Sequence, residues 1–174
     1  MTKNTKQNNT KESILYNNIL LLSRKKLFYT QFNLQDTFQN RIHLIFIHFS
    51  FLFIKIKENH DSKALKKFYQ KSFDHLFKQI EINMREIGYG DVSVNKNMKF
   101  LVKSFYTILL YCENYKNMTT SSKKAFFSKH LAFNNAKKAT NIKLIIKYFN
   151  KYHAFCLDLV SDSVLHGELN FSYY

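Results

Sequence analysis

The residues best suited to specific recognition lie in one short segment, residues 83–98. It contains Arg85, Glu86, Gly88, Gly90 and Asp91. The chain has only three glycines, three arginines and no proline, so a position that keeps Gly or Arg is expected to need it. Gly adopts positive φ at no steric cost, and the planar fork of Arg binds two acceptors in a way that Lys cannot imitate. The segment therefore predicts a fixed turn and a specific contact of Arg85.

Two interpretations of Arg85 are open. In the simpler one, Arg85 pairs with Glu81 at i, i+4 on an exposed helix face, while Gly88 and Gly90 end one helix and start the next. Such a pair gains little, and Lys would serve equally well. In the sharper one, the fork makes a bidentate contact, either within the turn or with a partner protein.

Histidines and carboxylates do not form a recognisable reaction centre. The sequence has no HExxH pair, glycine-rich phosphate loop or nucleophile elbow, and His43 and His48 lie on different sides of one helix. Asp36, Glu86 and Asp91 could meet in space, but caps and salt bridges are the commoner uses of such residues. We therefore expect no enzyme, no cofactor and no small-molecule substrate.

The two cysteines, Cys112 and Cys156, are too few and too isolated for a metal site or a disulfide framework. Both fall on apolar helical stripes, where a free thiol usually packs as a small hydrophobe. We expect both to be buried and unliganded.

Positive charge is concentrated in the C-terminal third. The formal net charge is +15, and no acidic residue occurs between Glu113 and Asp158. Such a field attracts an anionic membrane surface, RNA or a ribosome, although lysines also simply decorate solvated faces. The expected basic surface centres on Lys137, Lys138, Lys143 and Lys147.

Helical periodicity recurs in every long segment, which predicts an all-α fold: a single domain of about six helices over residues 13–174 after a flexible tail over residues 1–12. The tail resembles neither a signal nor a transit peptide, so we expect the protein to stay in the compartment where it is made. The expected helices cover about residues 11–25, 37–57, 62–87, 91–115, 122–133 and 137–165.

The second expected helix is the central one. Its run over residues 42–54 is apolar on two faces, as expected of a helix packed between neighbours. The run contains His43, His48 and Ser50 and is 13 residues long, short of the roughly 20 needed to span a bilayer.

Capping residues predict where several helices begin and end. Asp36 is expected to cap the second helix, and Asp91, Ser93 or Asn95 the fourth. Gly88 is expected as a left-handed C′ residue. Gly167 is expected to end the last helix, with an extended segment after it.

These segments together resemble the ubiquinol-cytochrome c chaperone family. The resemblance rests on LYNNILLLSR near the start, FYTQFNLQDTFQNR, the buried run LIFIHFSFLFIK, FDHLFKQIEINMREIGYGDVSVNKNM and a closing HGELNF. The block MREIGYGD is the most specific part. Asp36, Thr37 and Arg41 lie in the second of these segments, and all three arginines fall within matching ones.

The resemblance implies an all-helical, non-enzymatic assembly chaperone that binds newly made cytochrome b and promotes its maturation into respiratory complex III. It implies a partner-binding role for the residues of the two matching blocks: Asp36, Thr37, Arg41, Arg85, Glu86, Gly88, Gly90 and Asp91. Its further partners would be the ribosome, an anionic membrane surface and a helper subunit. It would act in the bacterial cytoplasm at the inner membrane, or at the matrix face of the mitochondrial inner membrane.

Two other classes remain open. A basic RNA-binding or ribosome-binding helical module without a cytochrome client would show salt-dependent RNA affinity. An acid/base enzyme acting on a lipid or quinone would need a deep pocket joining His43 or His48 to a perturbed carboxylate.

Overall fold

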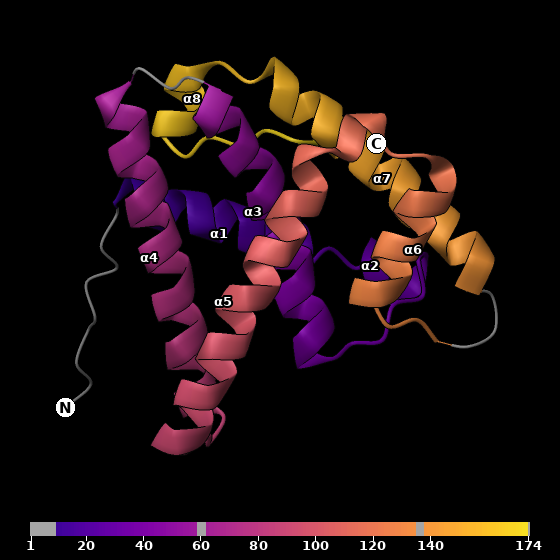
Figure 1. Cartoon of the computed structure of the whole chain (residues 1–174), viewed down its shortest axis with the longest axis horizontal. Coiled ribbons are helices and arrows are strands. Elements are labelled where there is room, and N and C mark those ends of the chain that lie inside the picture. The colour runs from indigo at the N-terminus through magenta and orange to yellow at the C-terminus, as the bar shows by residue number, and fades with distance from the viewer. Residues whose placement is uncertain (1–9, 59–61, 135–137, 174) are drawn as a thin grey trace.

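The structure is a computed structural model, and it describes residues 10–58, 62–134 and 138–173 (Figure 1). The described chain is all-α, as predicted, with no strand beyond an isolated bridge between Leu34 and Phe133. The helices are α1 (Lys11–Ser23), α2 (Leu27–Thr30), α3 (Phe38–Glu58), α4 (Lys63–Glu86), α5 (Asp91–Glu113), the 3₁₀ turn η1 (Tyr115–Asn117), α6 (Thr120–His130), α7 (Lys138–Asp158) and α8 (Ser161–Leu165). The six long ones correspond to the six expected helices.

Helix α3 is the centre of the fold, as its two apolar faces predicted. It packs against α1, α4, α5 and α7, and every side chain from Ile42 to Phe53 is buried. His48 lies wholly in this core, where its Nε2 is 2.9 Å from the hydroxyl of Tyr148 on α7. None of the described helices combines the length and apolarity required to cross a membrane.

Helices α4 and α5 form a long antiparallel hairpin that lies against α3. In Figure 1 the tip of this hairpin extends past the end of α3 at the bottom of the view. Met84 and Val94 are buried near the tip, so the hairpin is packed almost to its end. The turn that joins α4 and α5 lies outside the core.

Two predicted helix caps are wrong. Asp36 does not cap α3, because its carboxylate is bound by the guanidinium of Arg41 at 2.6 and 2.7 Å. The hydroxyl of Thr37 instead accepts from the amide of Asn40 at 3.2 Å. Helix α5 begins at Asp91 itself, and its N-cap is Gly90, which has no side chain to offer. The Asp91 carboxylate still favours the first turn through the helix dipole.

The expected last helix, residues 137–165, is in fact two helices. Helix α7 ends at Asp158, and Val160 takes an extended conformation before α8 begins at Ser161. The break turns the chain back so that Phe171 packs on Tyr152 of α7, with 5.1 Å between ring centroids. As expected, Gly167 at φ +73° ends α8, and no helix or strand follows it in the described chain.

Both cysteines are buried, as predicted, and neither forms a disulfide with a described residue; burial raises the pKa of both thiols. No group of three metal-ligating side chains gathers in the described part of the chain. The tail expected over residues 1–12 lies mostly outside the described residues, although Lys11 and Glu12 belong to α1.

Candidate partner-binding surfaces

The turn between α4 and α5 is a complete C-terminal capping motif. Gly88 has φ +95°, as predicted. Its amide donates to the carbonyl of Arg85 at 3.0 Å, and the amide of Tyr89 donates to that of Met84 at 3.0 Å. This pair of bonds defines a Schellman motif, which satisfies the last carbonyls of α4. The fold thus accounts for Gly88.

Gly90 differs from the expectation that every glycine here is needed. Its φ of −71° is open to any residue, and no atom lies within 4 Å of the position that a Cβ would take. Nothing in the fold therefore requires glycine at position 90.

The guanidinium of Arg85 joins the two helices across this turn. Its Nε and Nη2 donate to Glu81 Oε1 at 3.2 and 2.9 Å, and its Nη1 donates to Asp91 Oδ1. These bonds, to Asp91 first and to Glu81 second, raise the pKa of Arg85. One fork bridges acids on two helices, which explains why Arg rather than Lys stands here. Both the i, i+4 pair and a turn-locking contact are thus present.

The tip of the hairpin also exposes apolar side chains. Ile87, Tyr89 and Val92 are exposed beside the Arg85 fork, and Glu86 is exposed next to them. We call the set Arg85, Glu86, Ile87, Tyr89, Asp91 and Val92 the hairpin tip. Its apolar residues are separated in sequence by glycines and charges, so no hydrophobic periodicity marks them.

Asp36, Thr37 and Arg41 form a second, separate group at the start of α3. The Asp36 carboxylate and the Arg41 guanidinium form a two-point ion pair, which lowers the pKa of Asp36. No hydrogen bond or ion pair of the described residues joins this group to the hairpin tip. The structure therefore assembles each predicted block locally without bringing the two together.

The lysines of the C-terminal third serve two purposes. Lys123 lies 4.1 Å from the ring centroid of Tyr115, and Lys151 donates to the carbonyl of Tyr173 at 3.2 Å, so these two support the fold. Lys143 and Lys147 are exposed on α7. Among the described residues, no lysine of α6 or α7 forms an ion pair. Lys137 and the side chain of Lys138 lie outside what the structure describes.

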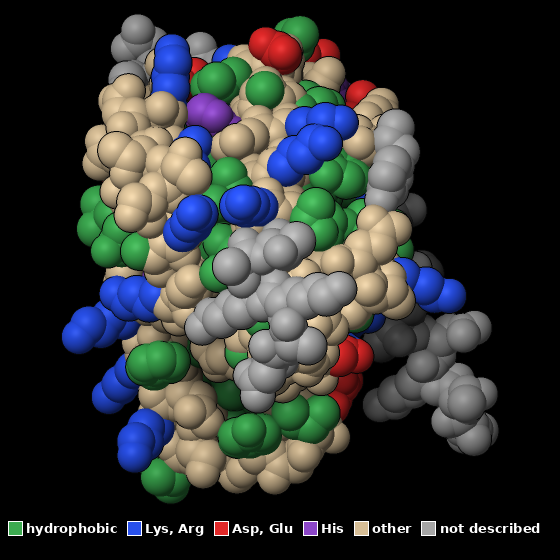
Figure 2. All heavy atoms as spheres, turned by 90° about the vertical axis from the view of Figure 1, so that its right-hand side faces the viewer, with side chains coloured by type: hydrophobic (Ala, Val, Ile, Leu, Met, Phe, Trp, Pro, Cys, Tyr) green, Lys and Arg blue, Asp and Glu red, His purple; other side chains and the backbone are tan. Residues whose placement is uncertain are grey.

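Figure 2 looks onto the side of the molecule that carries α6 and α7. Lys and Arg side chains are spread over this face with hydrophobic side chains between them, and acidic side chains are confined to its upper and right-hand edges.

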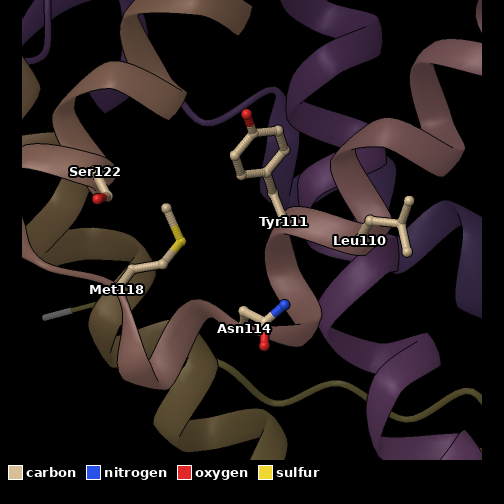
Figure 3. Close-up of a pocket in the computed structure, with 5 residues that line it drawn as sticks. All are labelled: Leu110, Tyr111, Asn114, Met118 and Ser122. Atoms are coloured by element: carbon tan, nitrogen blue, oxygen red, sulfur yellow. The ribbon is translucent and has the colours of Figure 1, made fainter.

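Sequence reasoning missed a groove between α5 and α6. At one end is a cavity of about 350 Å³, the apolar cavity, lined by Leu110, Tyr111, Asn114, Met118 and Ser122. Figure 3 shows Met118 reaching across towards Tyr111, with Leu110 on the far side of that ring. Leu110 is 63% exposed. The available signal was that Leu110 falls outside the apolar stripe by which α5 faces the core.

A second cavity is also lined by residues of α5 and α6, further towards the start of α5 and the end of α6. This basic cavity, about 310 Å³, is lined by His43, Phe100, Lys103, Ser104, Thr107, Lys129 and His130. The ring of Tyr111, which lines the apolar cavity, lies 6.4 Å from that of His130, which lines the basic one, so the two cavities are neighbours. No carboxylate lines either cavity among the described residues, and His48 is in the core. The arrangement expected of an acid/base enzyme, a histidine facing a perturbed carboxylate, is therefore not seen in that part of the chain.

Comparison with known proteins identifies the family. The model of the family described as "Ubiquinol-cytochrome C chaperone" matches residues 30–171 of this chain. The chain belongs to the ubiquinol-cytochrome c chaperone family. The matched region includes the hairpin tip, the Asp36 group and both cavities, and it confirms the resemblance seen in the sequence.

A solved structure has the same fold as this member of the family. The crystal structure of the Cbp3 homolog from Brucella abortus superposes with a TM-score of 0.78 at 21% identity, covering 93% of this chain and 88% of the other. A search of curated protein sequences gave no significant match.

Proposed function

We propose that this protein is an assembly chaperone that binds newly made cytochrome b and promotes its maturation into respiratory complex III. The observation that carries the proposal is the open groove between α5 and α6, found in a member of a chaperone family. We take the groove to be the client-binding surface.

The groove suits an apolar helix of the client. Leu110 and Phe100 on α5 are 63% and 60% exposed, and exposed apolar side chains gathered in a groove are typical of helix-binding sites. Met118 at the rim is flexible and adapts to different apolar surfaces. A client helix lying there would shield its own apolar face until it is assembled.

We expect Leu110→Gln to weaken client binding without unfolding the protein, because the side chain is largely exposed and Gln is a good helix former. The matched control is Leu21→Gln on α1, where the leucine is 69% exposed and lies outside the groove. The measurement is co-purification of newly synthesised cytochrome b with each variant, alongside the amount of assembled complex III. We expect Leu110→Gln to lower co-purification about fivefold or more, the effect of losing roughly 1 kcal/mol of apolar contact. Equal co-purification by both variants would remove the groove from the proposal.

The hairpin tip and the Asp36 group are proposed as additional recognition surfaces. Supporting this, Arg85 is exposed although it is bonded to two acids, and nothing in the fold requires glycine at position 90. A residue without a Cβ at position 90 permits close approach of another chain. We assign recognition to Arg85, Glu86, Gly88, Gly90 and Asp91, and to Asp36, Thr37 and Arg41.

Arg85→Lys tests the recognition role, because Lys keeps the charge and loses the fork. We expect the variant to fold with a nearly unchanged melting temperature, since the Schellman bonds are made by the backbone. We also expect it to lose client co-purification and complex III assembly. A folded Arg85→Lys protein with undiminished client binding would leave Arg85 as a residue that only locks the turn.

The exposed lysines of α7 support attachment to an anionic surface. Because Lys143 and Lys147 lack acidic partners in the described chain, their field is available to phospholipid headgroups or ribosomal RNA. We propose that the protein works close to the ribosome, at the bacterial inner membrane or at the matrix face of the mitochondrial inner membrane. A helper subunit is proposed as a further partner. RNA binding that depends on salt, with no effect on cytochrome b, would favour a purely RNA-binding module instead.

A further inference from the structure

We infer that the basic cavity binds a carboxylate side chain of the polypeptide segment that occupies the groove between α5 and α6. The inference deepens the proposed function and rests on it in one respect, namely that the groove holds a helix. It adds a chemical requirement for that helix: an acidic residue at a defined spacing from an apolar one.

The cavity has cations on both walls. Lys103 comes from α5 and Lys129 from α6, both are exposed, and neither forms an ion pair with any described residue. Lys129 Nζ lies 5.8 Å from the ring centroid of Tyr111, so one of the two charges stands beside the apolar cavity. Two unpaired cations facing one space favour an anion there.

His130 supplies an unsatisfied polar group at the same place. It is only 7% exposed, and its Nε2 has no hydrogen-bond partner among the described residues. The ring is held by Phe126 at 5.0 Å between centroids, and the backbone carbonyl of His130 accepts from Nδ1 of His43. A buried nitrogen without a partner is costly. Nε2 is itself enclosed, so it can donate to a carboxylate oxygen in the cavity only if it carries the hydrogen and the His130 ring turns towards the cavity.

Hydroxyl groups complete the lining. Ser104 Oγ lies 3.3 Å from His43 Nε2, and Thr107 follows it one turn along α5. Both hydroxyls already donate within the protein, Ser104 Oγ to His43 Nε2 and Thr107 Oγ1 to the carbonyl of Lys103 at 3.0 Å, so each can accept a further hydrogen bond but has no hydrogen left to donate. The cavity thus offers the ammonium groups of Lys103 and Lys129, with no competing acid in its described lining.

The distance between the two cavities predicts the spacing of the ligand. Tyr111 and Ser104 mark the two cavities on α5 and are seven residues apart in the sequence. This corresponds to about 10 Å, or two turns, at 1.5 Å per residue. A helix lying along the groove would place an apolar side chain in the apolar cavity and an acidic one in the basic cavity when they are about seven residues apart.

The test compares two amidated, fluorescently labelled helical peptides of about 16 residues. One has Leu at one position and Glu seven positions later, and the other has Gln in place of that Glu. The full-length protein is expected to bind the Glu peptide about tenfold more tightly, as for a hydrogen-bonded charge. The double variant Lys103→Gln/Lys129→Gln should reduce this preference to about twofold or less.

The matched control, Lys66→Gln/Lys67→Gln, removes the same charge from two exposed positions of α4 that line neither cavity. It should lower binding of both peptides only slightly and keep the preference for Glu. Equal affinities for the Glu and Gln peptides in the unaltered protein, or equal loss of preference in both double variants, would overturn the inference.

Two further arms separate this inference from the proposed function. A small probe, 3-phenylpropionate, should perturb the NMR signals of Lys103, Ser104 and His130 in the unaltered protein, whereas its neutral amide should not. Loss of cytochrome b binding in Leu110→Gln together with an absent carboxylate effect would retain the chaperone function and reject the carboxylate site. If instead the Lys103/Lys129 variant loses only its binding to phosphatidylglycerol vesicles, the cavity serves a lipid phosphate and the inference is wrong.

Discussion

Gly167→Ala should destabilise the protein by about 2–4 kcal/mol, the sum of a positive-φ penalty and overpacking. Gly167 has φ +73°, and an added Cβ would lie 2.9 Å from both the amide nitrogen of Leu15 and the carbonyl oxygen of Lys11. Both atoms belong to the backbone of α1, so neither can move aside like a flexible side chain. Its carbonyl also accepts from Nδ2 of Asn18 at 2.8 Å, which fixes its position.

The other two glycines are graded controls for this prediction. Gly88→Ala, at φ +95° in open space, should cost about 1 kcal/mol. Gly90→Ala should change stability by less than about 0.5 kcal/mol, because its backbone is ordinary and its surroundings are empty. Urea denaturation of the three variants is the measurement. If Gly167→Ala lowers the free energy of unfolding no more than Gly88→Ala does, Gly167 is not packed against the backbone of α1 as described.

Acidification from pH 7 to pH 4 should lower the free energy of unfolding by about 3 kcal/mol through His48 alone. Burial lowers the pKa of His48 from 6.5 to about 4. The unfolded chain therefore takes up the proton near pH 6.5, whereas the folded chain resists until about pH 4. Stability is full above pH 6.5 and falls as the pH drops towards 4.

The hydrogen bonds of His48 explain why its neutral form is preferred. The carbonyl of Leu44 can only accept, so Nδ1 of His48 carries the hydrogen and donates to it at 2.6 Å. Nε2 is then free to accept from the Tyr148 hydroxyl at 2.9 Å. Protonation of Nε2 would reverse the bond to Tyr148 and place a positive charge in a fully buried site. Burial lowers the pKa of His43 and of His130 as well. Acidification therefore also lowers the free energy of unfolding through these two residues.

Urea denaturation at pH 7, 5.5 and 4 measures this effect, and His48→Gln separates it from the titration of carboxylates. The variant loses some stability at pH 7 but should show a pH dependence about 3 kcal/mol smaller. An NMR titration should find that His48 stays neutral above pH 5. A His48 that titrates near pH 6.5 would contradict the buried, hydrogen-bonded position described here.

Much of the local structure could be predicted from the amino-acid sequence. The apolar spacing along α4, the two apolar faces of α3 and the glycine at position 88 each depend on contacts within a few residues. The sequence therefore predicted them correctly. The buried cysteines followed for the same reason, since each lies on an apolar stripe of its own helix.

Local signals failed where another side chain competed for the same group or where a distant segment packed back. Asp36 is a good cap by type, but Arg41 binds its carboxylate and leaves the cap to Thr37. Residues 158–161 contain no Gly or Pro, so no local residue type predicts the break after α7. That break is stabilised by Phe171 packing back on the aromatic face of α7.

By itself, the sequence determined the all-helical class, the central helix, the left-handed glycine at position 88 and the family. Only the tertiary structure decided that α6 lies beside α5, and therefore that a groove exists with Tyr111 between its two cavities. It also decided that His43 meets His130, which is 87 residues away along the chain. The physical reason is that helix spacing sets which face of a helix is apolar, whereas the packing of whole helices sets which faces meet and which are left open.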